Sequence, residues 1–291
     1  MVGMCLHALS RMATKNTALR CVVTMAIAVV FTCVSLAQRP AMHVMDAVND
    51  SVVDEGNTLY LHDKLNWVMS DAYKQMCSSK TASLRVVGQL NDTLMSGIMI
   101  DVDQMKCVFE CRLNLNTGEI EPLDMVRGLT PKEIARAERQ VALLEKVSDL
   151  DDIHNVAEAG NLNADVVEIA PTLTRVYLLQ GTNKAKLIPF GNDYSFDFDA
   201  AGNLIARRKY HNSFIPIDFG GKEDNIHKCT HSHLDDNPYI TPTDIATFLL
   251  YGHDLYGMKT FSVYSKAFGC YFTYYAETAT IVLVEDSDDM K

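Results

Sequence analysis

Short runs of alternating apolar and polar residues, separated by turn residues, most constrain how this chain can fold. Alternation with a period of two places every second side chain on one face of a strand. Residues 84–123 contain three or four such runs, with turns at Asn91-Asp92 and at Asn116-Thr117-Gly118. Residues 166–285 contain many more, interrupted by one helical stretch that begins near Thr241. The pattern therefore predicts an α+β fold with mostly antiparallel sheets and flanking helices.

Two further helices are expected in the first half of the chain. Apolar residues recur at three- and four-residue steps over residues 59–76, which predicts an amphipathic helix. Thr130, Pro131 and Glu133 have the order of an N-cap, a first helical residue and a reciprocal capping residue. An acidic, loop-like stretch at residues 148–163 follows that second helix. We therefore expect a linker at 38–56, an α+β domain of unknown role at 57–155, and a second domain at 156–291.

The first 37 residues resemble a secretory signal peptide. They contain three basic residues and no acidic residue, followed by an apolar run that ends at Ala37. Small residues at Ser35 and Ala37 predict cleavage before Gln38. The protein is then secreted or periplasmic, and it meets a membrane only through this segment if the segment stays uncleaved.

The net charge of the chain limits the classes of partner that it can bind. The chain has a formal net charge of −11, and removal of three basic groups with the signal makes it more acidic. An acidic surface repels phosphate, so nucleic acid is not expected as a partner.

Five cysteines follow residue 37, an odd number, so at least one thiol is free or in a metal site. Cys107 and Cys111 lie four residues apart on one predicted strand, and we expect their thiols on the same face, too far apart to form a bridge.

The strongest chemical motif is the pair His231 and His233. On a strand both imidazoles leave the same face and can hold one cation. Asp244 follows at the start of the Thr241 helix, where its carboxylate could be a third ligand. A helix-capping role for Thr241 and Asp244 would explain their presence at the start of this helix as well as a metal-binding role does. The pattern predicts a Zn²⁺ site with His231, His233 and Asp244 as ligands. Cys229 is on the same face, as a ligand or as a small buried residue. Three other histidines could hydrogen-bond to a ligand or lie at the surface: His211, His227 and His253.

One residue separates His231 from His233, seven residues separate His233 from Thr241, and two separate Thr241 from Asp244. This spacing resembles the signature of JAMM (MPN-type) metalloproteases. The resemblance covers about residues 166–285 and implies a JAMM/cytidine-deaminase-like fold for the domain at 156–291. In that family two His and the Asp hold zinc, a Ser orients the tetrahedral intermediate, and an upstream Glu is the general base. Thr241 replaces the Ser here and keeps the hydroxyl.

The family's general base has no clear counterpart. Thr174 occupies the closest offset, and Glu168 is the nearest upstream acid, with Glu158 and Glu223 as weaker candidates. The resemblance thus implies a secreted zinc hydrolase that cleaves an amide or isopeptide bond of a peptide or protein, with Thr241 and Glu168 as catalytic residues. The alternative is a non-catalytic envelope scaffold or binding protein with a degenerate JAMM-like domain.

Overall fold

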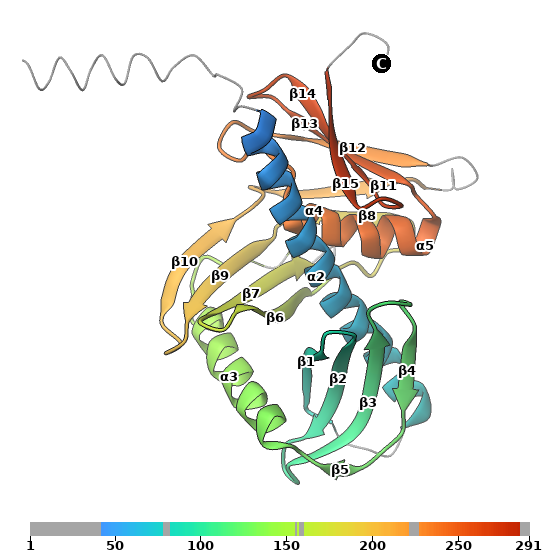
Figure 1. Cartoon of the computed structure of the whole chain (residues 1–291), viewed down its shortest axis with the longest axis vertical. Coiled ribbons are helices and arrows are strands. Elements are labelled where there is room, and N and C mark those ends of the chain that lie inside the picture. The colour runs from blue at the N-terminus through green and yellow to red at the C-terminus, as the bar shows by residue number, and fades with distance from the viewer. Residues whose placement is uncertain (1–41, 78–81, 155, 157–159, 221–226, 286–291) are drawn as a thin grey trace, which may run out of the picture. The chain divides into compact units, whose positions relative to one another are not determined.

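The computed structural model describes residues 42–77, 82–154, 156, 160–220 and 227–285 (Figure 1). The predicted signal segment lies outside these residues. Residues His43–Lys291 group into one compact unit. Of the helices in the described ranges, none combines the length and the apolar character that a membrane span needs.

Helix α2 spans Met42–Met76, so the linker expected at 38–56 is wrong over residues 42–56, and residues 38–41 lie outside the described residues. Asp46, Asp50 and Asp54 recur every four residues and are exposed, while Met45 and Val53 are buried. The segment is therefore an extension of the amphipathic helix predicted from residue 59.

The first sheet confirms the strands predicted from alternation. It contains β1 (Leu84–Asn91), β2 (Leu94–Asp101), β3 (Lys106–Asn114) and β4 (Ile120–Leu123) in antiparallel order, with the short β5 (Arg127–Gly128) also paired to β3. Helix α3 (Pro131–Ser148) follows, and the predicted capping box is present. Thr130 Oγ1 accepts from the Glu133 amide, and the Glu133 carboxylate accepts from the Thr130 amide.

A β-bulge in β3 overturns the expectation that Cys107 and Cys111 share a face. Met99 pairs with Phe109 and Ile100 pairs with Cys107, so Val108 is an extra residue that reverses the alternation. Cys111 packs in the cluster on the α2 side of the sheet, whereas Cys107 packs in the cluster on the α3 side. Both thiols are buried and free of disulfides.

Three further sheets follow in the described part of the chain. The first has the antiparallel order β10-β9-β7-β6, and β8 pairs with β11 as a separate two-stranded sheet. The last has the order β12-β13-β14-β15, in which β12 and β13 are parallel and the other pairs are antiparallel. The strands are β6 (Leu162–Ala170), β7 (Leu173–Gln180), β8 (Leu187–Gly191), β9 (Tyr194–Asp199), β10 (Leu204–Lys209), β11 (Phe214–Asp218), β12 (Lys228–His233), β13 (Thr260–Ser265), β14 (Cys270–Tyr275) and β15 (Thr280–Glu285).

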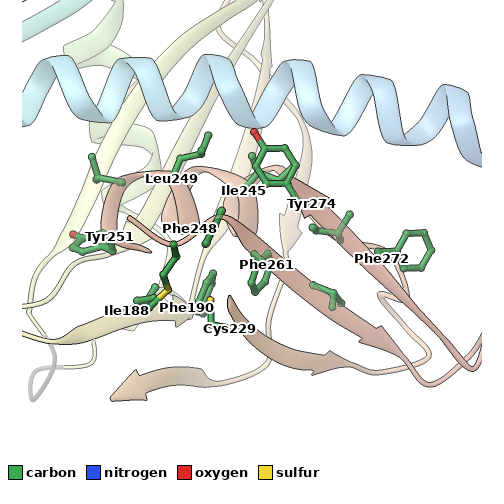
Figure 2. Close-up of a cluster of buried hydrophobic side chains, with 14 of the residues drawn as sticks. Ile188, Phe190, Cys229, Ile245, Phe248, Leu249, Tyr251, Phe261, Phe272 and Tyr274 are labelled. Atoms are coloured by element: carbon green, nitrogen blue, oxygen red, sulfur yellow. The ribbon is translucent and has the colours of Figure 1, made fainter. Parts of the chain in front are cut away.

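The crossover between the parallel strands β12 and β13 is helical, as parallel pairing requires. It consists of α4 (Pro242–Thr247), the π-helical segment η2 (Phe248–His253) and the short α5 (Asp254–Tyr256). Phe248 and Leu249 of η2 are buried in the largest apolar cluster, together with Phe190 and Phe261 (Figure 2). Mixed α+β architecture with mostly antiparallel sheets is therefore confirmed.

Helix α2 packs against several sheets in turn. Val53 belongs to the apolar cluster of β8 and β12–β14, Leu59 to a cluster with β6 and β7, and Leu65 and Met69 to the cluster under β1–β3. One helix therefore supplies side chains to the cores of both predicted domains. The expected boundary near residue 155 does not divide the described residues into two compact units.

Candidate metal centre

Four buried side chains converge at one point of the fold: His211, His231, His233 and Asp244. One ligand atom from each lies within 4.8 Å of the ligand atoms of the others. Each residue is at most 8% exposed. The four come from three segments: the turn after β10, strand β12, and the first turn of α4.

Strand β12 places His231 and His233 side by side, as their spacing predicts. Residues along β12 alternate between exposed and buried, and both histidines are on the buried face. Their Nε2 atoms are 2.9 Å apart. The ring of His231 makes edge contacts with both Phe190 and Phe261, which stack on each other, with centroid distances of 5.0 and 5.1 Å. Its Nδ1 has no hydrogen-bond partner within the described ranges, so the protein does not fix the tautomer of His231.

Asp244 takes both of the roles considered for it. Its Oδ2 accepts hydrogen bonds from the Thr241 amide at 2.9 Å and from the Thr241 hydroxyl at 2.7 Å, so the predicted capping box is present. Its Oδ1 is 3.3 Å from His211 Nε2 and 3.2 Å from His231 Nε2. Within the part of the chain that the structure describes, this oxygen is buried without a hydrogen-bond partner. One oxygen thus caps the helix while the other faces the imidazoles.

His211 completes the cluster, although its position in the sequence gives it no ligand spacing. Its Nε2 is 2.8 Å from His233 Nε2. On the opposite side of the ring its Nδ1 is 2.7 Å from Asp193 Oδ1. Asp193 also accepts a hydrogen bond from the Thr243 hydroxyl in the first turn of α4. Asp193 lies in a turn between β8 and β9, so only folding brings it to His211.

Hydrogen bonds fix the tautomers of two histidines. A carboxylate and a carbonyl can only accept, so His211 donates Nδ1–H to Asp193 and His233 donates Nδ1–H to the Tyr239 carbonyl at 2.6 Å. In a neutral ring the other nitrogen, Nε2, then has a lone pair. Two lone pairs facing each other at 2.8 Å repel, so this arrangement requires a cation between them, either a proton or a metal ion.

The ionisation of the cluster fits such a cation. Burial alone would lower the pKa of His211, but the carboxylates of Asp193 and Asp244 outweigh it and raise the pKa well above its usual range. Burial lowers the pKa of His233 to about 4. Burial would raise the pKa of Asp244, but the three imidazoles hold it well below its usual range. The cluster therefore presents an anionic carboxylate to a shared positive charge.

The donor types and several of their spacings fit a zinc ion. Zinc bonds of about 2.0–2.1 Å to nitrogen and oxygen give a tetrahedron with edges of about 3.3–3.4 Å. Asp244 Oδ1 is 3.3 Å from His211 Nε2 and 3.2 Å from His231 Nε2, and Asp244 Oδ2 is 3.4 Å from His233 Nε2. The two short distances between imidazole nitrogens, 2.8 and 2.9 Å, would lengthen by about half an ångström. Three imidazoles and one carboxylate then form a closed four-ligand set.

The other predicted site residues lie elsewhere or have other partners. Glu168 is on β6 with a 58% exposed side chain that pairs with Arg136 at 3.4 Å, and it is not a member of the cluster. Thr174 binds Arg139. Cys229 is buried on the ligand face of β12 but is not in the cluster, and burial raises the pKa of its thiol to about 12. His227 and His253 lie outside the cluster, while Glu158 and Glu223 lie outside the described residues.

Comparison with protein-family models, with curated proteins and with solved structures yields no match for this chain.

Proposed function

We propose that this protein is a non-catalytic scaffold or binding protein of the cell envelope whose fold is held by a structural Zn²⁺ ion. One observation carries the proposal. In catalytic zinc sites three protein ligands leave the fourth position to water, whereas structural sites are closed by four. Here His211 stands where the fourth ligand would be, and all four side chains are buried.

The position of the cluster suits a structural role. Its ligands join the turn after β10, strand β12 and the first turn of α4, which are separated by about 20 and 10 residues along the chain. A closed metal site stabilises a fold by tying such segments together, because the unfolded chain does not hold the ligands in place. Asp193 and the Tyr239 carbonyl orient two of the imidazoles, as outer hydrogen bonds do at metal sites.

The choice of zinc follows from the ligands. Imidazole nitrogens suit zinc, copper, iron and nickel, and a tetrahedral arrangement with one carboxylate is a common zinc geometry. Hard cations such as Ca²⁺ and Mg²⁺ require mostly oxygen ligands, which this cluster lacks.

Metal content of purified variants tests the proposal. The wild type should hold about one zinc per chain, and His233→Ala and His211→Ala should both lose it. His253→Ala is the matched control, because the imidazole of His253 binds the Met258 carbonyl and is outside the cluster. X-ray absorption at the zinc edge should show three imidazoles in the wild type. Equal zinc in His233→Ala and the wild type would show that there is no metal at this cluster.

A JAMM-type hydrolase is the second candidate. It is favoured by Thr241, whose hydroxyl lies against the Asp244 carboxylate at 2.7 Å and which is one of the residues that line a groove of about 810 Å³. A bound Zn²⁺ would polarise a substrate carbonyl and lower the pKa of water. The hydroxyl of Thr241 would donate a hydrogen bond to the substrate, and a carboxylate would have to take up a proton. Glu168 pairs with Arg136 and Asp193 with His211, so neither is free for that role in this arrangement.

Two measurements separate the candidates. A scaffold retains four protein ligands at zinc and cleaves neither a fluorogenic peptide nor an isopeptide-linked substrate. A hydrolase should show zinc-dependent cleavage that Thr241→Val reduces by about 10²-fold or more while zinc stays bound. Fractionation of cells that express the full chain, with the mature N-terminus sequenced, tests secretion and cleavage before Gln38.

A further inference from the structure

A second polar site lies apart from the metal centre, in a cavity of about 560 Å³. The cavity is bounded by α2, the start of β6, residues 181–187, and the helical segment after α4. One face of α2 lines it, because Asp63, Asn66 and Trp67 recur at three- and four-residue steps. The metal-centre residues are not among those that line it.

Two buried carboxylates face this cavity. Asp63 is 7% exposed and Asp165 is 2% exposed. Asn66 Nδ2 donates to Asp165 Oδ1 at 2.6 Å, whereas Asp165 Oδ2 is buried without a hydrogen-bond partner in the described part of the chain. Burying a carboxylate without a full set of donors or a counter-ion is costly. Asp165, a residue that lines the cavity, therefore has one buried acceptor oxygen without a donor.

Three basic side chains also line the cavity: Lys74, Arg85 and Lys184. Lys74 pairs with Asp71 at 3.5 Å, and Arg85 Nη1 donates to Ser70 Oγ at 2.9 Å. The charge of Arg85 lowers the pKa of Asp63 and of Asp165, but burial outweighs it. Burial raises the pKa of Asp63 to about 6, and burial together with the nearby Asp63 carboxylate raises the pKa of Asp165 well above its usual range. In the absence of a ligand the pair therefore takes up a proton, which a bound cation could displace.

An aromatic pair forms the adjoining wall. Trp67, the only tryptophan of the chain, is 37% exposed and lies 5.7 Å from Tyr251 between ring centroids. Both residues line the cavity. Aromatic faces beside carboxylates are a favourable environment for an organic cation, which gains both ion pairing and cation–π attraction.

We propose that this cavity binds an organic ammonium ligand, with Asp63 and Asp165 as counter-ions and with Trp67 and Tyr251 against its alkyl substituents. A neutral polyol would supply donors but would leave the like charges of the two carboxylates uncompensated. A hard divalent cation needs six or more oxygen ligands or retained waters, and it gains nothing from the aromatic wall.

Calorimetric titration of the full chain with n-butylamine tests the proposal. The uncharged alcohol 1-butanol, which has the same size, is the matched ligand, and CaCl₂ represents a metal site. We expect n-butylammonium to bind with a dissociation constant of about 1 mM, as befits a five-atom ligand, and 1-butanol to bind at least tenfold more weakly. Equal affinity for the amine and the alcohol, no heat with the amine, or displacement of the amine by Ca²⁺ would overturn the assignment.

Variants place the ligand in the cavity. Asp165→Asn should weaken amine binding at least tenfold, and Trp67→Leu should weaken it about threefold to tenfold. Asp46→Asn, on the exposed face of α2 outside the cavity, removes the same charge and should leave binding within twofold.

A fold readout separates lost binding from unfolding. Asp165→Asn removes one of two like charges, so its melting temperature without ligand should equal or exceed that of the wild type. Loss of amine binding at an unchanged melting temperature supports the site. If Asp165→Asn instead melts early, Trp67→Leu decides, because its partly exposed ring is not needed for the core. Unchanged binding in Trp67→Leu would then contradict the proposal.

Discussion

Replacing Asp193 by Asn is the sharpest perturbation of the proposed zinc centre, because it leaves all four ligands in place. Asp193 accepts Nδ1–H from His211 at 2.7 Å and accepts the hydroxyl of Thr243. In the variant, one oxygen becomes an NH₂ group. If that NH₂ group faces His211, it opposes another donor, the Nδ1–H of the imidazole. If it faces Thr243, the hydroxyl of Thr243 must rotate so that it accepts instead of donates. Either arrangement weakens the control over the orientation and basicity of the His211 ring.

The magnitude follows from the role of such outer hydrogen bonds. Their loss costs about 10–100-fold in metal affinity, equivalent to about 1.4–2.7 kcal/mol. Zinc in excess stabilises the folded protein in proportion to the logarithm of its affinity. For a folded unit of about 250 residues, the difference in melting temperature between zinc-loaded and chelator-treated protein should therefore shrink by roughly 3–10 °C.

Competition against a chromophoric chelator measures the affinity, and thermal melting with and without zinc measures the stability. Asp236→Asn is the matched control, because Asp236 is exposed, accepts a hydrogen bond from Asn212 Nδ2 at 3.3 Å and is not a member of the ligand cluster. It should retain wild-type affinity and the full difference in melting temperature. Wild-type zinc affinity in Asp193→Asn would refute the role assigned to the hydrogen bond between Asp193 and His211.

Three further predictions concern the fold and its ionisable groups. Phe248→Ala removes a fully buried ring, so urea denaturation should show a loss of about 3–5 kcal/mol, and a loss below about 1 kcal/mol would contradict the packing. The hydrogen bond from Arg127 lowers the pKa of Glu133 to about 2, so the stability it adds is present above about pH 4.5 and is lost as the pH falls toward 2. Glu133→Gln should therefore flatten the stability profile over that range, and parallel profiles would argue against the ion pair. Burial raises the pKa of Cys111 to about 11, so iodoacetamide should label it only on unfolding, and rapid native labelling would contradict its burial.

Local features of the sequence were the ones that could be predicted. The alternation of His231 and His233 gives a shared face on any strand, and the strand is present. The two capping boxes, at Thr130 and Thr241, also form as predicted, because a cap depends only on residues within one turn. The strands of the first sheet follow their alternating pattern for the same reason.

Predictions failed in two places: where one extra residue changed the alternation of a strand, and where the composition of a segment was followed instead of its helical periodicity. The bulge at Val108 moves Cys107 and Cys111 to opposite faces, and nothing in the alternating run indicates where an extra residue will be accommodated. The acidic start of α2 was interpreted from its composition as a linker, although its aspartates follow the helical period. Periodicity was the better guide there.

The sequence by itself determined which side chains of β12 and α4 can act together, because their spacing is set by the geometry of a strand and of a helix cap. Only the tertiary structure decided that His211 and Asp193 join them, since each lies in a connection between strands of two sheets, far along the chain from its partners. It also decided that Glu168 does not, because β6 directs that carboxylate to Arg136. Contacts between distant segments depend on how sheets and helices pack, which no local spacing encodes. For that reason the sequence predicted three ligands, and the fold adds a fourth side chain, the imidazole of His211, to the group that could hold a metal ion.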